Sequence, residues 1–441
     1  MKKYEQVYEK LRNDILEGYL KNHQQLPSIR QSCQIFKVSQ TTIQHAYDQL
    51  LLEGYIVNKP QVGYFVDIQD ERIQLHKKID TYKNTHEEIN YLYDLRSQTV
   101  SHDSFETRLW KRYLRDVLDN TENMSTYGDS QGEYELREAL AQYAYKMRSV
   151  LCDPHHILIG SNFQSLLFIL VGLMPQHFVI GMEKHENSQI KRALQSHNHQ
   201  VVTIKSLEDG IDIDDLKNYH IDVLYINTSS QGLKKKPISH KLRNQLLSYT
   251  SRHHILVIED DYNGELTYQS KNRYSIQGIS YSDNVIYCGS FSRLLLPSFR
   301  ISYMVLNDEF YHIYQAVKNE YGSTTSKLEQ LAFSRYIVDG YLVKHVKRLK
   351  KLYKKKSDIM KQCLEKYIPY PLYLNEAYLC YYIELHEVDE KKIESECQKR
   401  KIAINSIQDH KLEVSFASIS IDQIEDVIKK LSQIINQSMK L

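Results

Sequence analysis

Six short apolar runs recur between residues 156 and 287, and each is followed by a turn and a polar stretch of helical character. This alternation is typical of an α/β sheet whose strands are joined by crossover helices. Ligands in such sheets bind beyond the carboxyl ends of the strands, so we expect a pocket there. The predicted strands are 156–159, 178–180, 201–204, 223–226, 255–258 and 285–287.

The chain is too long for a single hydrophobic core, and its 441 residues predict two or three domains. With 25% charged and 41% hydrophobic residues, its composition is that of a globular protein. No apolar run approaches the roughly 20 residues that a membrane-spanning helix needs. The charged start lacks the apolar stretch of a signal peptide, so we expect a soluble, cytoplasmic protein with no membrane partner.

Metal and nucleotide chemistry have little support in the sequence. The six cysteines are scattered without a C-x-x-C spacing, which argues against a zinc ribbon, a redox motif or a disulfide framework. The adjacent pairs His155-His156 and His253-His254 do not direct both rings to one ligand, so we expect no metal site. Neither a G-x-G-x-x-G motif nor a P-loop occurs.

The first part of the chain has the pattern of three helices followed by a hairpin. Val7, Leu11 and Ile15 recur every four residues, and Gly18 stands where a left-handed C-cap would follow. Ser28 and Ser39 are N-cap residues for a second and a third helix. Two apolar strands, 55–57 and 64–66, are joined by residues 58–63, which include a glycine.

The third helix of this segment separates an apolar face from a polar one. The predicted buried face consists of Ile43, Ala46, Tyr47, Leu50 and Leu51. The open face consists of Gln40, Thr41, Gln44, His45 and Asp48. Short hydrogen-bonding side chains on an exposed helix suit the major groove of DNA, so the segment reads as a winged helix-turn-helix. A small helical domain with a polar third helix is the alternative.

Charge gives this segment only a weak nucleic-acid signature. Residues 1–65 carry eight lysine or arginine residues and six acidic ones, and the whole chain has a net charge of +2. We therefore expect most of the affinity for DNA to come from dimerisation and from a few phosphate contacts, such as that of Arg30.

Several short motifs in this segment match a known family. They are Leu26-Pro27-Ser28-Ile29-Arg30, Val38-Ser39-Gln40-Thr41-Thr42-Ile43, Ala46-Tyr47-Asp48-Gln49-Leu50 and Glu53-Gly54-Tyr55-Ile56. Residues 1–66 closely resemble the GntR-type DNA-binding domain. In that family an arginine often follows the serine that opens the recognition helix, where this chain has Gln40. The resemblance implies DNA contacts by Arg30, Ser39, Gln40, Thr41, Thr42, Gln44, His45 and Gly63.

Polar side chains follow two of the predicted strands of the sheet. Glu259-Asp260-Asp261-Tyr262 comes after one strand, Ser290-Phe291-Ser292-Arg293 comes after another, and Arg300 lies seven residues further on. An acid, a phenol, hydroxyls and a guanidinium at one sheet edge suit an aromatic phosphate, because the acid can pair with a protonated ring nitrogen while the others hold the phosphate. Ordinary polar loops are the alternative.

The order of these segments, with Tyr127-Gly128-Asp129 and Gly160-Ser161-Asn162 before them, resembles the MocR/GabR-type regulators. In that subfamily a fold-type I aminotransferase domain follows the GntR-type domain. The resemblance implies an α/β fold with a winged helix at residues 1–66, a linker at 67–92 and an aminotransferase-like domain at 93–441, of which 325–441 form a smaller subdomain. It also implies double-stranded DNA as partner, a head-to-tail homodimer and a small-molecule effector.

The same resemblance implies a pyridoxal phosphate site. Asp260 would face the pyridine nitrogen, and Tyr262 and Gln231 would lie near the ring oxygen. The residues expected around the phosphate are Ser161, Asn162, Ser290 and Arg300.

Four positions depart from the family's catalytic pattern. Arg293 stands where the lysine that binds the cofactor covalently is expected, and a guanidinium stays charged and cannot act as an amine nucleophile. The ring-stacking tyrosine falls on Asn187, the proline-threonine-glycine turn reads Gly232-Leu233-Lys234, and the arginine that binds the substrate carboxylate falls on Glu413. We therefore expect no aminotransferase activity and, at most, non-covalent binding of the cofactor. An active aminotransferase with an accessory DNA-binding module is the alternative.

Two charge patterns leave further alternatives open. Arg293 and Glu413 are expected either to pair across the old site or to be solvated independently. The run from Lys344 to Lys356 is the most basic in the chain, and it reads either as a DNA contact or as a solvated helix face.

Overall fold

The computed structural model describes residues 2–67, 90–97, 99–100, 104–120, 125–184, 188–268, 274–280 and 283–439. The chain forms two compact units, Met1–Asn90 and Tyr91–Leu441. Of the expected linker at 67–92, residues 68–89 lie outside the described ranges.

The N-terminal unit has the predicted order of helices and strands. Its helices are α1 (Lys3–Leu16), α2 (Ile29–Phe36) and α3 (Gln40–Leu52), and its antiparallel hairpin consists of β1 (Ile56–Lys59) and β2 (Gly63–Val66). The hydroxyls of Ser28 and Ser39 accept hydrogen bonds from backbone N–H groups in the first turns of α2 and α3, which fixes where both helices begin. Gly18 follows α1 with φ of +85°, as a left-handed cap requires.

The core of this unit lies between the three helices and the hairpin. Tyr47 is fully buried, and its hydroxyl hydrogen-bonds the hydroxyl of Ser32 and the carbonyl oxygen of Pro27, both at 2.8 Å. The prediction that Leu51 is buried is wrong, since its side chain is 39% exposed. Leu50 and Ile56 already fill the core at this end of α3, and Leu51, one residue further round the helix, faces outward. The other core residues are Val7, Leu11, Ile15, Leu16, Leu26, Ile43, Ala46 and Val66.

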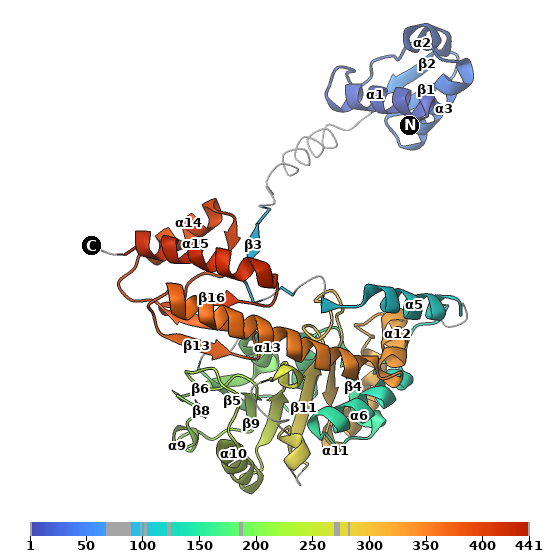
Figure 1. Cartoon of the computed structure of the whole chain (residues 1–441). Coiled ribbons are helices and arrows are strands. Elements are labelled where there is room, and N and C mark those ends of the chain that lie inside the picture. Colours follow the sequence, from blue (N-terminus) through green and yellow to red (C-terminus); the bar gives the residue numbers. More distant parts are fainter. Residues whose placement is uncertain are drawn as a thin grey trace. The chain divides into compact units, whose positions relative to one another are not determined.

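A seven-stranded mixed sheet forms the centre of the larger unit (Figure 1). All six predicted strands are present, displaced by up to three residues at their ends. A seventh strand, β12 (Ser302–Val305), runs antiparallel between two of them. The others are β4 (Ile157–Gly160), β5 (Val179–Glu183), β6 (Gln200–Ile204), β9 (Val223–Asn227), β10 (Leu256–Asp260) and β11 (Val285–Ser290), in the order β4-β12-β11-β10-β9-β5-β6.

Helices cover both faces of this sheet because successive residues of its strands point to opposite sides. Leu158 packs in a cluster with α7 (Phe163–Leu173), α8 (Ser188–Leu194) and α11 (Asp308–Val317). Its neighbours Ile157 and Ile159 pack in a second cluster with α5 (Thr107–Leu118) and α6 (Tyr134–Arg148). Further along that face lie α9 (Ile213–Leu216) and α10 (His240–Arg252), next to the small hairpin of β7 (Ser206–Leu207) and β8 (Gly210–Ile211).

The C-terminal part of this unit is a smaller α+β layer. Its sheet has the order β13-β14-β16, and a short parallel pair joins β3 (Tyr93–Asp94) to β15 (Ile402–Ala403). The helix α13 (Tyr341–Tyr367) crosses the molecule between this layer and the central sheet (Figure 1). The remaining elements are α12 (Lys327–Val338), β13 (Leu372–Asn375), β14 (Cys380–Glu384), α14 (Glu390–Lys399), β16 (Lys411–Ser415) and α15 (Ile424–Gln437).

Within the described ranges, no helix is both long and apolar enough to cross a lipid bilayer.

Candidate functional site

The polar face of α3 is presented to solvent as a set of hydrogen-bonding groups. Gln40, Thr41 and His45 are exposed. Thr42 and Gln44 are half-buried, and the Gln44 amide donates a hydrogen bond of 2.9 Å to Asp48. Ser39, in contrast, is engaged as the cap of α3, so its hydroxyl is largely committed within the protein. The surface therefore offers amide, hydroxyl and imidazole groups of the kind that read base edges in the major groove.

Arg30 and Gly63, the two predicted contacts outside α3, line one surface hollow. The hollow measures about 920 Å³ and lies between the start of α2 and the tip of the hairpin. Gly63 has φ of +128°, and a Cβ there would lie 3.1 Å from the side-chain nitrogen of Gln25. Since that nitrogen donates to the carbonyl oxygen of Val62 at 2.8 Å, glycine at position 63 allows the hairpin to be held against the helices. The exposed Arg30 guanidinium thus lies close to the wing.

In the larger unit, two neighbouring aspartates at the end of β10 have different partners. Asp261 is fully buried and forms a two-point ion pair with Arg148, with N–O distances of 2.6 and 3.0 Å. Asp260 is also buried, but the partner of its carboxyl group among the described residues is the neutral hydroxyl of Tyr225, which donates a hydrogen bond of 2.7 Å. Burial raises the pKa of Asp260 to about 7, although the hydrogen bond from Tyr225 opposes this shift. Asp260 is therefore a buried carboxyl group suited to a cationic ligand atom.

Arg293 is buried at the start of the loop that follows β11. Its Nε donates to the hydroxyl of Tyr262 at 3.0 Å, and its Nη1 donates to the carbonyl oxygen of Tyr378 at 2.8 Å. The guanidinium carbon lies 6.0 Å from the centroids of both tyrosine rings, which are themselves 5.2 Å apart. Two of its N–H groups are thus committed to tying the central sheet to the smaller layer.

Other hydrogen bonds close the same contact around the turn between β13 and β14. Asn375 donates to the hydroxyl of Ser230 at 3.2 Å, and Asn263 donates to the carbonyl oxygen of Ala377 at 2.8 Å. Together with Arg293 and Tyr378, these bonds fix the turn over the carboxyl ends of β9, β10 and β11. Arg293 is therefore integrated into the local structure.

Glu413 does not pair with Arg293. Its carboxylate accepts hydrogen bonds from the backbone N–H of Ser97 and the amide of Asn405, both at 3.0 Å, and from the hydroxyl of Tyr382 at 3.4 Å. Within the described ranges no ion pair links the two residues, so the predicted pairing across the site is wrong: neutral donors already surround Glu413. Independent solvation is also wrong for Arg293, which is only 5% exposed.

A hollow of about 690 Å³ opens beside Glu413, between the central sheet and the smaller layer. Four lysines line it together with two acids, so its charge is positive overall. Glu208 pairs with Lys234 at its edge. The charged lining residues are Lys184, Lys234, Lys235, Lys411, Asp409 and Glu413.

The residues expected around a phosphate lie at the start of α7 and the end of β11. Asn162 caps α7, and the backbone N–H of Ser161 donates to the hydroxyl of Thr324 at 3.0 Å. Ser290 shares hydroxyl hydrogen bonds of 3.1 Å with Ser292 and Ser302. A helix N-terminus flanked by hydroxyls favours an anion. Arg300 is exposed and forms no ion pair within the described ranges.

Two further expected positions have different outcomes. Gln231 is fully buried, and its side-chain amide donates to the carbonyl oxygen of Asn227. Its Oε1 has no hydrogen-bond partner within the described ranges, so one acceptor is left over near the site. Asn187 lies outside the described residues.

Sequence reasoning missed Tyr225 and Tyr378. Tyr225 lies inside an apolar strand, where a tyrosine reads as core, although its hydroxyl is the one that contacts Asp260. Tyr378 accepts a hydrogen bond from Arg293 through its backbone carbonyl. Every residue has such a carbonyl, so the residue type at position 378 does not predict this contact. Across the described ranges, no group of three or more histidine, cysteine, aspartate or glutamate side chains is arranged to hold a metal ion.

The arrangement has features that fit the two ends of pyridoxal phosphate but none that fits its covalent attachment. The buried Asp260 suits a protonated ring nitrogen, and the start of α7 with Ser161 and Ser290 suits the phosphate. At position 293, where the family resemblance predicts the reactive lysine, the guanidinium of Arg293 donates to the hydroxyl of Tyr262 and the backbone carbonyl of Tyr378.

The fold and these two surfaces define the class of protein. Residues 3–66 match the family model of bacterial regulatory proteins of the gntR family, and residues 100–431 match that of aminotransferase class I and II. The chain therefore belongs to the GntR-type regulators that carry an aminotransferase class I and II domain, as the MocR/GabR-type subfamily does.

Several of its relatives in sequence are transcriptional regulators. An uncharacterised HTH-type transcriptional regulator of Bacillus subtilis, YdeL, is 31% identical over 366 residues, which cover 82% of this chain and 79% of that protein. The probable rhizopine catabolism regulatory protein MocR of Rhizobium meliloti is 26% identical over 373 residues, 81% of this chain and 76% of its own length. The chain is accordingly a DNA-binding transcriptional regulator.

Solved aminotransferases share the fold of the larger unit. The kynurenine aminotransferase of Pyrococcus horikoshii superposes with a TM-score of 0.68 at 20% identity and covers 84% of this chain and 97% of its own. An archaeal alanine:glyoxylate aminotransferase gives a TM-score of 0.70 at 19% identity, with 82% and 95% covered. At these identities the likeness concerns the fold.

Proposed function

We propose that the larger unit of this regulator is a catalytically inert aminotransferase fold that dimerises and binds a small effector without a covalent bond. The observation that carries the proposal is Arg293, which occupies the position of the reactive lysine and is held by Tyr262 and Tyr378. A guanidinium remains protonated at any physiological pH, so it has no free electron pair with which to attack an aldehyde.

Loss of the substrate anchor supports the same conclusion. Where an aminotransferase has an arginine for the substrate carboxylate, this chain has Glu413, whose carboxylate is used to hold Ser97 and Asn405. A carboxylate repels the carboxylate of an amino acid. Both the covalent step and substrate binding therefore lack their usual side chains.

The features that remain favour a ligand that combines an anionic group with a protonated nitrogen. Asp260 would bind the nitrogen, the start of α7 with Ser161 and Ser290 would bind a phosphate, and Arg300 would add a charge from the surface. Pyridoxal phosphate has both groups, and when bound it supplies an electron sink. Here Asp260 would only orient it. The lysines of the neighbouring hollow favour an effector with further negative charge.

A head-to-tail homodimer in the cytoplasm completes the proposal. Two winged helices on one dimer bind adjacent half-sites with an effective concentration that raises the overall affinity. This compensates for the small excess of positive charge in the N-terminal unit.

The alternative function is an active aminotransferase with an accessory DNA-binding module. An activity assay and a thermal melt distinguish it from the inert, effector-binding unit proposed here. The full chain is incubated with pyridoxal phosphate and pairs of amino acids and keto acids, and its thermal midpoint is measured with and without the cofactor. We expect no turnover and a rise of the midpoint that depends on cofactor concentration, as for any ligand that prefers the native state. Asp260→Asn should abolish that rise, whereas the exposed Asp209→Asn should retain it.

Turnover of any pair by the unaltered protein would contradict the claim of inertness. A melt that pyridoxal phosphate and free amino acids leave unchanged would contradict the claim of effector binding. The two results are independent: the activity assay tests the claim of inertness, and the melt tests the claim of effector binding.

A further inference from the structure

The helix α5 of the larger unit carries four positive charges along one side. Arg108, Lys111, Arg112 and Arg115 are spaced by three and four residues, which places them on one face of a helix, and all four are exposed. Trp110, Tyr113 and Val117 are buried on the other side. None of the four cations forms an ion pair with a described residue.

A second set of cations lies along the first half of α13. Residues 341–357 contain eight lysine or arginine residues and no acid. Lys356 is buried and donates to the carbonyl oxygen of Ala417, and Lys350 is half-buried. The other six are exposed, namely Lys344, Lys347, Arg348, Lys351, Lys354 and Lys355.

An ion pair with Glu106 and contacts between tyrosine rings connect the cations of α13 to those of α5. Arg348 pairs with Glu106, the residue immediately before α5, at 2.7 Å. The ammonium of Lys344 lies 4.9 Å from the ring centroid of Tyr341. That ring is 6.3 Å from the ring of Tyr113, over which Arg112 lies at 5.3 Å.

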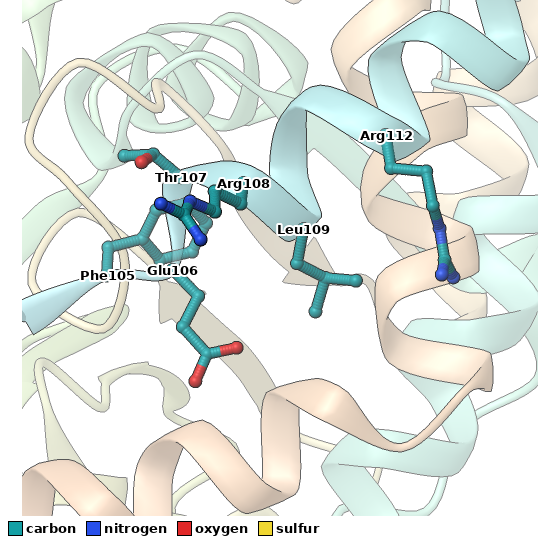
Figure 2. A pocket seen from close by; sticks show the side chains of 6 residues that line it. All are labelled: Phe105, Glu106, Thr107, Arg108, Leu109 and Arg112. Atoms are coloured by element: carbon teal, nitrogen blue, oxygen red, sulfur yellow. The ribbon is translucent and has the colours of Figure 1, made fainter.

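Figure 2 shows Arg108, Arg112 and Glu106 around the hollow at the start of α5, which measures about 510 Å³. The exposed cations of α5 therefore adjoin those at the start of α13, and further exposed cations continue along α13 to Lys355. We call these ten cations the basic face.

The charge of the basic face exceeds that of the winged helix. Its ten exposed cations exceed the two exposed acids beside them, Glu106 and Asp116, by eight charges. Residues 1–65 carry an excess of two. Like charges at this density repel one another and destabilise the surface unless an anionic partner compensates them.

We propose that the basic face binds the phosphate backbone of DNA outside the segment that the winged helix reads. The proposal rests on the function of the chain as a DNA-binding regulator. From Lys344 to Lys355, α13 rises about 16 Å at 1.5 Å per residue, the length of about five base pairs at ~3.4 Å each. Flexible lysine and arginine side chains on exposed helices bind phosphates without reading bases, so this contact adds affinity and not sequence preference.

The salt dependence of binding tests the proposal. The full-length unaltered protein and the variant Arg108→Gln/Arg112→Gln/Lys347→Gln/Lys351→Gln are titrated, over a series of salt concentrations, with the DNA upstream of the protein's own gene and with a random duplex of equal length. The matched control removes four exposed cations from α8 and α10: Lys191→Gln/Arg192→Gln/Lys241→Gln/Arg252→Gln. Circular dichroism melts establish that both variants fold.

The slope of log K against log salt is negative. We expect its magnitude to decrease by up to about 3.6 in the basic-face variant, which is about 0.9 for each lost phosphate contact. The loss should be equal on both duplexes, and the control should keep the slope of the unaltered protein. Equal slopes for all three proteins would overturn the proposal and leave the DNA-reading function intact. If the unaltered protein bound neither duplex, the DNA-binding function itself would fail, and the proposal with it.

Discussion

The N-terminal unit and the buried site of the larger unit both retain the outline of a family motif, but they retain different things. In the N-terminal unit the serine caps, the core and the exposed polar face of α3 are all in place. In the larger unit we infer that Asp260 and Tyr262 persist and that Arg293 stands in place of the reactive lysine.

We infer from this difference that a binding site can keep its fold and part of its ligand-binding groups after it has lost its catalytic residue. Arg293 is bonded to Tyr262 and Tyr378, and Glu413 is bonded to Ser97 and Asn405, so each side chain is integrated into the fold. Gln40, Thr41 and His45 of α3 are exposed, so they are accessible to a DNA partner. We therefore expect substitutions to affect the two regions in separable ways.

The largest expected effect is on the stability of the larger unit. Asp261→Ala would leave the buried guanidinium of Arg148 without its carboxylate and should cost about 3–5 kcal/mol. Chemical denaturation monitored by circular dichroism measures the loss. The matched variant Ser229→Ala removes only a hydroxyl hydrogen bond of 3.3 Å to the same aspartate and should cost far less. Equal midpoints for Asp261→Ala and the unaltered protein would contradict a structural role for this pair.

A smaller effect is expected on DNA recognition. Gln40→Ala removes an exposed amide from the start of α3, so it should reduce the preference for the upstream DNA over a random duplex by about 1–3 kcal/mol, the value of one base contact. Stability should not change. Gln49→Ala, on the same helix but bonded to Glu53, serves as the control and should retain the preference. An unchanged preference in Gln40→Ala would remove this residue from the reading surface.

The pH dependence of stability tests the environment of Asp260. Because burial raises its pKa from 3.8 to about 7, the native state holds a proton that the unfolded state has released. The free energy of unfolding should therefore fall as the pH rises from about 4 to about 7, by at most about 1.4 kcal/mol per pH unit from this group. Asp260→Asn should flatten this slope, and Asp209→Asn should not. A slope that Asp260→Asn leaves unchanged would show that the carboxyl group is ionised throughout.

The smallest expected effect concerns a single phosphate contact. Arg30→Gln should weaken binding to all duplexes alike and lower the slope of log K against log salt by about 1. Lys10→Gln, whose ammonium pairs with Asp14 on α1, is the control and should keep the slope. A change in sequence preference in Arg30→Gln would assign this residue to base reading instead.

Much of the fold follows from local sequence patterns. Ser28 and Ser39 mark the starts of α2 and α3 because a hydroxyl before a helix satisfies N–H groups that have no other partner. The strand β12 was not predicted because it returns antiparallel to β11 after a loop, without the crossover helix that marks the other strands. Leu51 was predicted to be buried from helical periodicity but is exposed, because periodicity alone does not predict where the hydrophobic core ends along a helix.

The site was predictable only where a residue type reveals its chemistry. Asp260, Tyr262 and Arg293 stand out as polar residues at strand ends. The partners of Arg293 and Glu413 could not be predicted, because a backbone carbonyl at Tyr378 and a backbone N–H at Ser97 are brought to the site only by the packing of the smaller layer.

The most direct test of the loss of chemistry is the mass of the intact protein after incubation with pyridoxal phosphate and reduction with borohydride. When free aldehyde and its reversible imines with exposed lysines are removed by dialysis before the reduction, we predict the mass of the polypeptide alone for the unaltered chain. Arg293→Lys, which restores an amine at this position, shows that a covalent adduct would be detected. A stoichiometric increase by one pyridoxyl phosphate group in the unaltered protein would contradict the account.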